Sequence, residues 1–368
     1  MASKKNNLGA FLAKNMKRKE QLNREWYALR GMLSYSWAMI LFLIGGREAG
    51  KSYAVTDFCV NQWKRRGRPF YWLRLTETSA GKLLMNGAEK LVDPDIRRRW
   101  KLDLVTVGDA VYEVTKRGPK KEDGRPGKII EKKLMARVLA LNTFYNDKGS
   151  GLFDKDFLKD PNMYYNIVCD EMNREQSEKN TFDIVYAFSN QVENIVRSTK
   201  KRIRIICIGN LLSDASDLLT AINFIPETFG RFKIKKKRAV VEYIEPSKKY
   251  LDRRKGTVAD IFSGQSSTFT NVIDLDRTLI SKKRLRKPSY VVAFTNTDKF
   301  TVWDGNVVAP YNNEKCNVIA MRPYLDYLFE TKARDTVMQL FDTRSYCFRN
   351  LVTQKIFKKN LALLKPRK

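Results

Sequence analysis

The sequence LFLIGGREAGKSYA, residues 41–54, places an apolar run of strand length directly before a glycine-bounded loop. The loop has the spacing Gly45-x-x-x-x-Gly50-Lys51-Ser52, which is the phosphate-binding pattern when a strand precedes it and a helix follows it. The glycines let the backbone turn tightly, so that loop N–H groups point at phosphate oxygens, and a helix beginning at Lys51 adds positive potential. The stretch therefore predicts a nucleoside triphosphate site; the alternative is a glycine-rich turn with a chance Lys-Ser pair.

This pattern gives each position of the loop a role. Lys51 is expected to reach the β and γ phosphates, and the Ser52 hydroxyl is expected to take a ligand place on Mg²⁺. The cofactors predicted here are ATP and Mg²⁺. We expect the cofactor to contact the whole loop, which comprises Gly45, Gly46, Arg47, Glu48, Ala49, Gly50, Lys51, Ser52 and Tyr53.

A pair of acids follows another apolar run, YYNIVCDEMN at 164–173. A phosphate-binding loop needs a carboxylate from a neighbouring strand, and this run ends in Asp170 and Glu171. We expect Asp170 to hold the water shell of the Mg²⁺ ion as its metal residue, and Glu171 to polarise the attacking water as the catalytic Glu. An acid directly after the metal-binding Asp favours the additional-strand, catalytic-Glu division of P-loop ATPases. The alternative is an ordinary loop start.

Two further strand ends carry polar residues that we expect beside the nucleotide. Asn210 ends RIRIICIGN (202–210), and because the carboxyl ends of parallel strands face the ligand, it is placed to sense the γ-phosphate or orient water. A turn asparagine is the alternative. Arg74, in FYWLRLTE, is placed to pair with Glu171 in one state and release it in another, since pairing misdirects the oxygens of the carboxylate. A fixed structural ion pair is the alternative.

Arg197, in NIVRSTKKRIR, is the candidate for a catalytic arginine that acts on a neighbouring subunit. In ring NTPases an arginine near this position reaches the neighbour's nucleotide, and such a finger is worth roughly 10³–10⁵ in rate. Its rivals are Lys200, Lys201 and Arg202, and the plain alternative is a surface charge.

The charge of the chain predicts a polyanionic partner. Its 368 residues include 70 Lys and Arg against 40 Asp and Glu, a formal charge of +30 at pH 7. Nucleic acid is the commonest partner of such a chain, with a basic proteome or an anionic membrane as the alternatives. No apolar run reaches the roughly 20 residues of a spanning helix, and the basic N-terminus lacks a signal-peptide core. We therefore expect an intracellular chain and no membrane.

The absence of histidine excludes every mechanism that needs an imidazole, including Ser-His-Asp triads and most zinc hydrolases. The five cysteines lie far apart without a CxxC pair, which predicts buried free thiols in a reducing cytoplasm. Carboxylate, lysine and arginine side chains are left to carry the chemistry.

Alternating strand-like and helix-like segments predict an α/β domain with a mostly parallel sheet over the first two-thirds of the chain. Several strand candidates are continuous apolar runs, as in central strands covered on both faces. The Gly- and Pro-rich charged segment 117–133 predicts a β-ribbon or an exposed loop. We expect a P-loop ATPase domain over 1–245, a linker over 246–275 and a small α/β domain over 276–368. The strand candidates of the first domain are Met39–Ile44, Phe70–Leu75, Asp103–Val107, Tyr164–Cys169 and Arg202–Ile208.

Together these motifs resemble one family, the DNA-packaging ATPases of small protein-primed podoviruses of the phi29 type. The resemblance begins with MLSY (32–35) and continues through GGREAGKSYA, IVCDE and VRSTKKRIRIICIGN. It is looser in RRKGTVADIFSG (253–264), FTVW (300–303) and the final helix, and so covers most of the chain. It implies an additional-strand, catalytic-Glu P-loop ATPase domain, followed by a C-terminal domain that resembles a vestigial, inactive RNase H-like nuclease.

The resemblance also assigns roles residue by residue. Arg197 matches the family's trans-acting arginine after a one-residue insertion, and Lys148, in NDKGSG, falls near a trans-acting lysine. Where the family has a lysine after the second strand, this chain reads LTET (75–78), so that role is lost or moved. The Walker A and Walker B positions fall on residues already singled out, namely Lys51, Ser52, Asp170 and Glu171.

For the C-terminal domain, the resemblance implies a nuclease fold that has lost its metal-binding acids. Asp298 and Asp304 are the only nearby strand acids that we can pair, and an active two-metal nuclease needs a tighter carboxylate cluster. We predict no nuclease activity, and a terminal helix within 350–364. The strands expected in this domain are Ser289–Phe294, Phe300–Trp303, Val307–Ala309 and Val318–Met321.

Members of the family assemble as a ring at the portal vertex of an empty procapsid, contact a structural RNA and drive double-stranded DNA inward with ATP. The partners implied are duplex DNA, the portal or connector and procapsid, packaging RNA, and copies of this chain in a homo-oligomeric ring, expected to be a pentamer. The place implied is the host cytoplasm during virion assembly, and not the mature virion. Candidates for DNA contact, each with a solvated loop as the alternative, are Lys148, Arg174 and Lys179.

Three function classes are compatible with these motifs. A double-stranded DNA translocase grips duplex phosphate, which makes binding independent of sequence and sensitive to salt. A ring helicase or recombination ATPase shares the motor but needs aromatic stacking positions for single strands. A non-motor binding protein with a degenerate nucleotide site is the third class, and the intact Walker residues argue against it.

Overall fold

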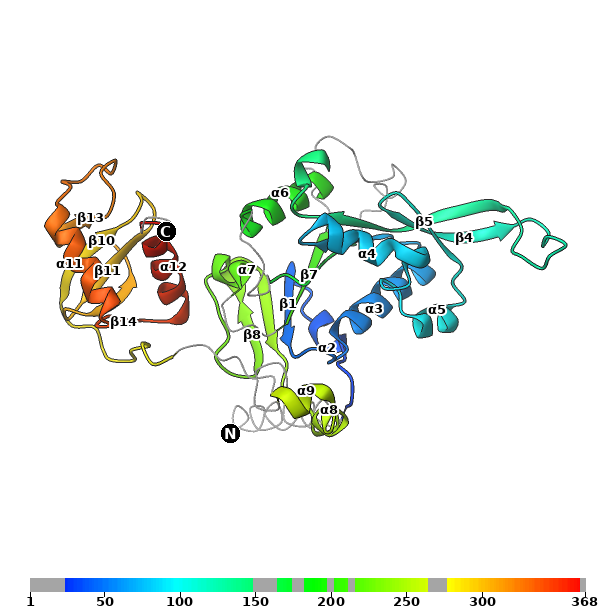
Figure 1. Cartoon of the computed structure of the whole chain (residues 1–368), viewed down its shortest axis with the longest axis horizontal. Helices are drawn as coiled ribbons and strands as arrows, with labels where there is room; N and C mark the ends of the chain where they lie inside the picture. The colour runs from blue at the N-terminus through cyan, green and yellow to red at the C-terminus, as the bar shows by residue number, and fades with distance from the viewer. Residues whose placement is uncertain are drawn as a thin grey trace, which may run out of the picture. The chain divides into compact units, whose positions relative to one another are not determined.

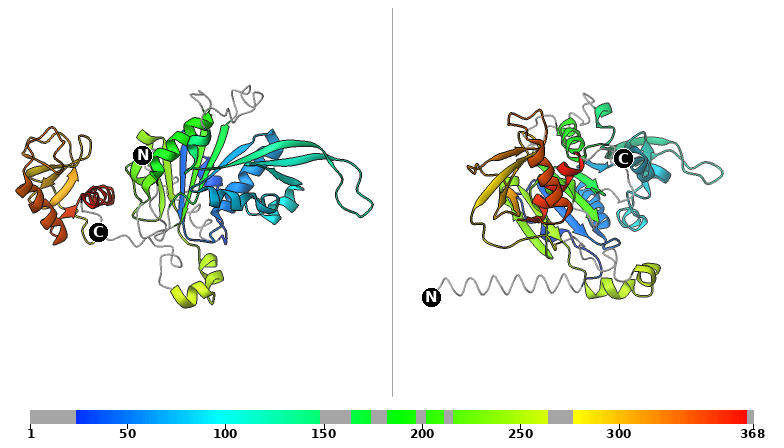
Figure 2. Two further views of the ribbon diagram at one scale, coloured as in Figure 1. Left: turned by 45° about the horizontal axis from the view of Figure 1, so that its top comes forward. Right: turned by 60° about the vertical axis from the view of Figure 1, so that its left-hand side comes forward.

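The computed structural model describes residues 24–147, 164–173, 182–196, 202–210, 216–263 and 277–364. The chain divides into two units, one formed by residues 1–212 and 226–273 and the other by residues 213–225 and 274–368 (Figure 1, Figure 2). In the ranges that the structure describes, no helix is long and apolar enough to cross a membrane.

The first unit is built on a nine-stranded sheet. Its strands are β1 (Ile40–Gly45), β2 (Phe70–Arg74), β3 (Leu104–Val107), β4 (Ala110–Arg117), β5 (Ile129–Ala140), β6 (Tyr164–Asp170), β7 (Arg202–Asn210), β8 (Gly230–Ile234) and β9 (Ala239–Tyr243). They lie in the order β3-β4-β5-β2-β6-β7-β1-β9-β8. The six central strands, β5-β2-β6-β7-β1-β9, are parallel. The antiparallel strands β3 and β4 extend one edge of the sheet, and the antiparallel strand β8 extends the other. The expected mostly parallel α/β sheet is confirmed.

Helices cover both faces of this sheet. The β1–α3–β2 and β6–α6–β7 connections run in opposite directions along the sheet, so right-handed crossovers place α3 and α6 on opposite faces (Figure 1). Helix α3 ends at Gly67, whose left-handed φ of 60° closes the helix after a basic last turn. The helical elements are α2 (Arg30–Leu33), α3 (Lys51–Arg66), α4 (Glu77–Ala88), α5 (Pro94–Trp100), η1 (Phe144–Asp147), α6 (Ile184–Val196), η2 (Lys235–Lys237), α8 (Lys248–Arg254) and α9 (Val258–Ser263).

The predicted linker over 246–275 is wrong in its first part, because α8 and α9 lie there and group with the first unit. The Ser247 hydroxyl caps α8 by accepting a hydrogen bond from the backbone N–H of Tyr250 at 3.0 Å. The predicted first domain also differs from the structure, since residues 213–225 group with the second unit. There, Asp217 pairs with Lys355 at 3.1 Å.

The second unit contains a five-stranded mixed sheet in the order β13-β10-β11-β12-β14. Phe357 fills its core, with its ring 5.2, 5.4 and 5.6 Å from the rings of Phe294, Phe300 and Phe348. The short strands and the terminal helix expected from the sequence are present, whereas the RNase H-like character stays a prediction. The elements are α7 (Asp217–Ala221), β10 (Pro288–Ala293), β11 (Lys299–Trp303), β12 (Val307–Pro310), β13 (Val318–Ala320), α11 (Thr331–Asp342), β14 (Cys347–Phe348) and α12 (Leu351–Ala362).

The cysteines follow the sequence-based expectation only in part. Cys59, Cys169 and Cys207 are buried free thiols within the first unit, as predicted from their apolar surroundings. Cys316 and Cys347 are free but only partly buried, which corrects the expectation that all five are buried. The partial exposure follows from their places, one in a loop and one in a two-residue edge strand.

Candidate nucleotide-binding site

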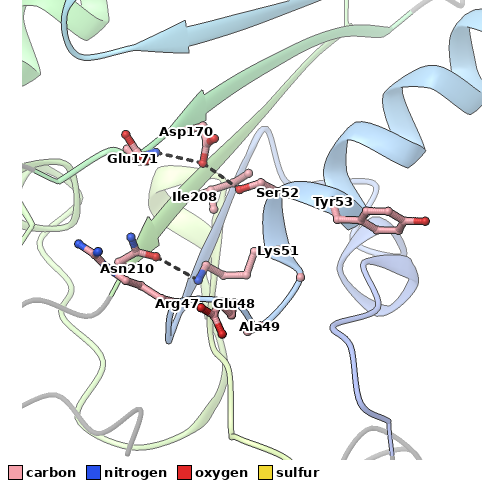
Figure 3. Close-up of a pocket in the computed structure, with 11 residues that line it drawn as sticks. Arg47, Glu48, Ala49, Lys51, Ser52, Tyr53, Asp170, Glu171, Ile208 and Asn210 are labelled. Atoms are coloured by element: carbon pink, nitrogen blue, oxygen red, sulfur yellow. Dashed lines mark hydrogen bonds between the residues drawn. The ribbon is translucent and has the colours of Figure 1, made fainter. Parts of the chain in front are cut away.

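Three neighbouring parallel strands end at one edge of the large sheet. Gly45, at the end of β1, pairs with Asn210 at the end of β7, and Asp170 of β6 lies opposite Ile208 of β7. The loops that follow therefore meet around a cavity of about 370 Å³, a volume typical of small-molecule sites (Figure 3). The residues that line it are Arg47, Glu48, Ala49, Gly50, Lys51, Ser52, Tyr53, Asp170, Glu171, Ile208 and Asn210.

The loop after β1 needs glycine at position 50. Gly50 precedes the first residue of α3 with a left-handed φ of 82°, and a Cβ there would lie 3.1 Å from a ring carbon of Trp26. The backbone N–H of Tyr27 donates to the carbonyl of Ala49 at 2.9 Å, which ties the loop to the segment before β1. This fixes the start of α3, whose first N–H groups have no partner within the helix and so suit an anion.

Lys51 is folded over its own loop and is only 5% exposed. Its Nζ donates to the carbonyls of Gly45 at 2.9 Å and Gly46 at 2.6 Å, and lies 3.4 Å from Oδ1 of Asn210. The pKa of Lys51 is lowered to about 8, mainly by burial. The charge of Asp170 raises this pKa, and the charge of Arg47 lowers it further. A nearby negative charge favours the ammonium form of lysine, so an anion beside Nζ would raise the pKa of Lys51 again. The arrangement therefore suits phosphate.

Ser52 and Asp170 form the candidate metal pair. The Ser52 hydroxyl donates to Oδ1 of Asp170 at 3.1 Å (Figure 3), and Nη2 of Arg74 lies 3.1 Å from the other carboxylate oxygen. Burial raises the pKa of Asp170, while Arg74 lowers it and Glu171 raises it. A hydroxyl and one carboxylate in contact are hard oxygen donors that fit Mg²⁺, which is commonly held by one or two carboxylates plus substrate phosphates. In the described ranges no cluster of three or more His, Cys, Asp or Glu offers a self-sufficient metal cage.

Glu171 follows β6 in a left-handed conformation, with a φ of 55°. This turn lets its backbone N–H donate to Oδ1 of Asp170 at 3.1 Å and leaves its side chain 57% exposed. Its carboxylate contacts Nη1 of Arg74, so the ion pair predicted as one of two states is present in the structure. Arg74 does not line the cavity; its guanidinium bridges both acids instead of facing the loop.

Asn210 and Tyr53, both predicted to contact the cofactor, hydrogen-bond to residues outside the phosphate-binding loop. The carbonyl of Asn210 accepts a hydrogen bond from Nδ2 of Asn173 at 3.1 Å, which holds the end of β7 against the turn after β6. The Tyr53 side chain points away from the phosphate-binding loop in Figure 3, and its hydroxyl donates to Oδ2 of Asp95 at 2.6 Å. Tyr53 lines the cavity at the start of α3, with its hydroxyl already engaged elsewhere.

Side chains of α8 hydrogen-bond to the backbone of the phosphate-binding loop, and sequence reasoning missed these contacts. The Tyr250 hydroxyl and Nη1 of Arg254 each donate to the carbonyl of Arg47 at 2.9 Å, and Nη2 of Arg253 donates to the carbonyl of Glu48 at 2.7 Å. We call these three α8 residues the brace. They belong to a strongly basic run that resembles a solvated face, and only the 3% exposure of both Tyr250 and Arg254 reveals their place. The looser family resemblance over RRKGTVADIFSG (253–264) includes Arg253 and Arg254, but it gives no indication that they contact the loop.

Four predicted residues lie outside the residues that the structure describes. They remain predictions, and they are Arg197, Lys148, Arg174 and Lys179.

No family model matches the chain. Curated relatives include the DNA packaging proteins of Bacillus phages PZA and phi29, each 26% identical over 212 residues, or 57% of this chain and 53% of the relative. The DNA packaging protein of Bacillus phage B103 is 24% identical over 229 residues, covering 61% of this chain and 60% of the relative. The chain has homologues among phi29-type DNA packaging proteins. It spans about half the length of the curated relatives it matches.

Solved structures of two phage DNA packaging motors show the same fold. A chain of the bacteriophage Phi-29 viral genome packaging motor assembly matches 93% of this chain and 100% of its own length, with a TM-score of 0.60 and 19% identity. The Phi-28 gp11 DNA packaging motor matches 94% of this chain and 99% of its own length, with a TM-score of 0.56 and 15% identity. The shared fold therefore extends over both units.

Proposed function

We propose that this chain is an ATPase that drives double-stranded DNA into a preformed viral procapsid. The observation that carries the proposal is the meeting of Lys51, the Ser52–Asp170 pair and Glu171 around one cavity at the carboxyl edge of a parallel sheet. The relatives named DNA packaging proteins supply the task. The formal charge of +30 suits a polyanionic cargo.

The site residues divide the work of phosphoryl transfer to water. Bound Mg²⁺-ATP supplies the scissile phosphoanhydride and a cation that neutralises developing charge. Lys51 neutralises phosphate charge, while Ser52 and Asp170 would hold the metal. Glu171 orients the attacking water once Arg74 releases its carboxylate, and Asn210 keeps Lys51 in place. Because the transition state requires orientation more than covalent help, these positions account for the chemistry.

We further propose a homo-oligomeric ring, a pentamer, at the portal vertex, with a structural RNA as partner and the host cytoplasm as its place of action. The shared fold with a packaging motor assembly supports this. Arg197 would complete the neighbour's site. An additional-strand, catalytic-Glu type of ATPase domain is consistent with Glu171 directly after Asp170.

For the second unit we propose an RNase H-like fold without nuclease activity. Asp298 and Asp304 flank β11 at its two ends, so these acids do not form the close carboxylate cluster that a two-metal site needs. Cutting of DNA by the full chain with Mg²⁺ or Mn²⁺, abolished in Asp298→Asn, would overturn this.

ATP turnover in the presence of duplex or single-stranded DNA separates the function classes. Duplex stimulation supports the translocase, single-strand stimulation supports a ring helicase, and no hydrolysis in any assembly state supports a degenerate binding protein. ATP-driven filling of cognate procapsids is the decisive assay. There, Arg197→Ala mixed into wild-type rings is expected to depress packaging by more than its share, and a linear dilution of activity would contradict the trans role.

A further inference from the structure

Strands β4 and β5 continue beyond the sheet as a two-stranded ribbon (Figure 1, Figure 2). Phe70, the first residue of β2, pairs with Ala136, so the first seven residues of β5 run past the amino end of β2. At about 3.3 Å per residue, this overhang is about 23 Å long. We define the ribbon as residues 116–133. It leaves the amino edge of the sheet, whereas the nucleotide site lies at the carboxyl edge.

The ribbon is held in a defined shape. Arg117 donates two hydrogen bonds to the carboxylate of Asp103, at 2.5 and 2.8 Å, which fixes the ribbon's base. One residue further along, the backbone N–H of Gly118 donates to the carbonyl of Lys128 at 2.8 Å. A Cβ on Gly127 would lie 2.1 Å from the carbonyl oxygen of Pro119, so the two arms approach closely only because this residue is glycine. The charges on the ribbon are therefore presented on an ordered scaffold.

The ribbon carries eight basic and three acidic residues. Three of the basic residues have acidic partners, in the pairs Arg117–Asp103, Arg125–Asp123 and Lys133–Glu131. Five exposed lysines have no ion pair with any residue that the structure describes. One of them, Lys132, has its Nζ 4.4 Å from the ring centroid of Tyr112, and the other four are Lys116, Lys120, Lys121 and Lys128. Since the exposed lysines make no ion pair within the fold, a polyanion from outside the chain is their natural partner.

We infer that the ribbon binds the phosphate backbone of duplex DNA. Residues 116–133 contain no aromatic side chain, which argues against single strands, whose bases need stacking partners. The major groove of B-form DNA admits a two-stranded β-ribbon, whereas that of duplex RNA is too deep and narrow. This inference rests on the proposed function and names a surface that contacts its cargo.

The test uses the full chain without nucleotide and follows the fluorescence anisotropy of a labelled duplex between about 0.05 and 0.2 M salt. In the ribbon variant, we expect the Kd for duplex DNA to rise about tenfold. The slope of log K against log salt should become shallower by about 0.9 for each phosphate that the ribbon no longer neutralises. The ribbon variant combines Lys116→Gln, Lys120→Gln, Lys121→Gln and Lys128→Gln.

Two matched variants isolate the ribbon from overall charge. Arginine at the same four ribbon positions keeps the charge and is expected to keep the affinity. A control variant removes four exposed lysines elsewhere and is expected to bind duplex DNA within about twofold of the wild type, because isolated surface charges are screened. It combines Lys82→Gln, Lys90→Gln, Lys101→Gln and Lys332→Gln.

Each outcome decides between the inference and its rivals. Equal reductions in affinity in the ribbon and control variants would show a general charge effect and overturn the inference. An equal reduction for duplex RNA would overturn the assignment to DNA. If duplex DNA stimulates ATP turnover in the wild type but the ribbon variant binds it normally, only the ribbon inference falls. If the wild type binds no duplex at any salt concentration, the proposed function falls with it.

Discussion

Strands β6 and β11 both carry two acids at their ends, yet only those of β6 belong to a cluster. Asp170 contacts Ser52 from the loop after β1 and Arg74 from the end of β2. In the second unit, Asp298 immediately precedes β11 and Asp304 immediately follows it. Asp298 accepts one hydrogen bond from Asn360 at 3.2 Å, and Asp304 accepts backbone N–H groups at 3.0 and 3.2 Å.

The difference lies in which strand ends carry the acids. β1, β6 and β7 are parallel neighbours, so the residues after each strand meet at the same edge of the sheet. Asp298 precedes β11 and Asp304 follows it, so the two acids lie at opposite edges of the sheet, one at each end of the same strand. Acids at strand ends become a candidate site only where the topology makes them converge, and elsewhere they serve the fold.

The largest effect should come from Glu171→Gln, which keeps the shape of the side chain but removes the carboxylate. Removing an acid–base group typically costs about 10²–10⁴-fold, so we expect ATP turnover to fall by that factor while ATP binding is retained. Turnover and equilibrium nucleotide binding measured on the same protein check this. Asp298→Asn is the matched change in the second unit and should leave turnover unaltered. A comparable fall in both variants would break the comparison.

Arg74→Ala should have the next largest effect, because Arg74 bridges Asp170 and Glu171. If the ion pair keeps Glu171 away from the water, Arg74→Ala should raise DNA-independent turnover about tenfold and abolish stimulation by DNA. A tenfold rise corresponds to a barrier lowered by about 1.4 kcal/mol when the paired state is lost. Arg74→Lys keeps the charge but cannot make the same fork, and it should retain part of the stimulation. Unchanged turnover and stimulation in Arg74→Ala would reduce this pair to a structural contact.

The brace should contribute less, because it acts through the backbone of the loop. Tyr250→Phe removes one hydrogen bond to the carbonyl of Arg47 while Arg254 still donates to it. A hydrogen bond is worth about 1 kcal/mol, so the Kd for ATP should rise about fivefold. Tyr290→Phe is the matched control, since the Tyr290 hydroxyl hydrogen-bonds the Tyr346 hydroxyl in the second unit and not the loop. Calorimetric titration with ATP measures both, and equal affinities in the two variants would count against the brace.

The nucleotide site could be predicted from sequence because its signals are local. The apolar runs ending at Gly45, Asp170 and Asn210 identify buried parallel strands, and a parallel sheet brings their ends together without further information. The Arg74–Glu171 pair follows from the same rule, applied to β2. The second contact of Arg74, with Asp170, depends on the direction of the Arg74 side chain, and strand positions alone do not give that direction.

The brace and the unit boundaries could not be predicted, because they depend on contacts between distant parts of the chain. Arg254 and Arg47 are more than two hundred residues apart, and a buried arginine in a basic run has no distinguishing pattern. The placement of α7 with the second unit depends on contacts such as that between Asp217 and Lys355. Hydrophobic periodicity reports which face of an element is buried, and not which distant element covers it.

The smallest effect is expected from Asp304→Asn, which tests whether the acids of β11 serve only the fold. Asp304 has a left-handed φ of 50°, and its two carboxylate oxygens accept the backbone N–H groups of Arg286 and Lys287. Asparagine tolerates this backbone and keeps one acceptor oxygen, so the free energy of unfolding should decrease by about 1 kcal/mol. Thermal unfolding should show a small downward shift, with ATP turnover unchanged. A fall in turnover without a change in stability would mean that Asp304 acts on the motor, and that convergence at a parallel edge is not the only way this chain builds function from strand-end acids.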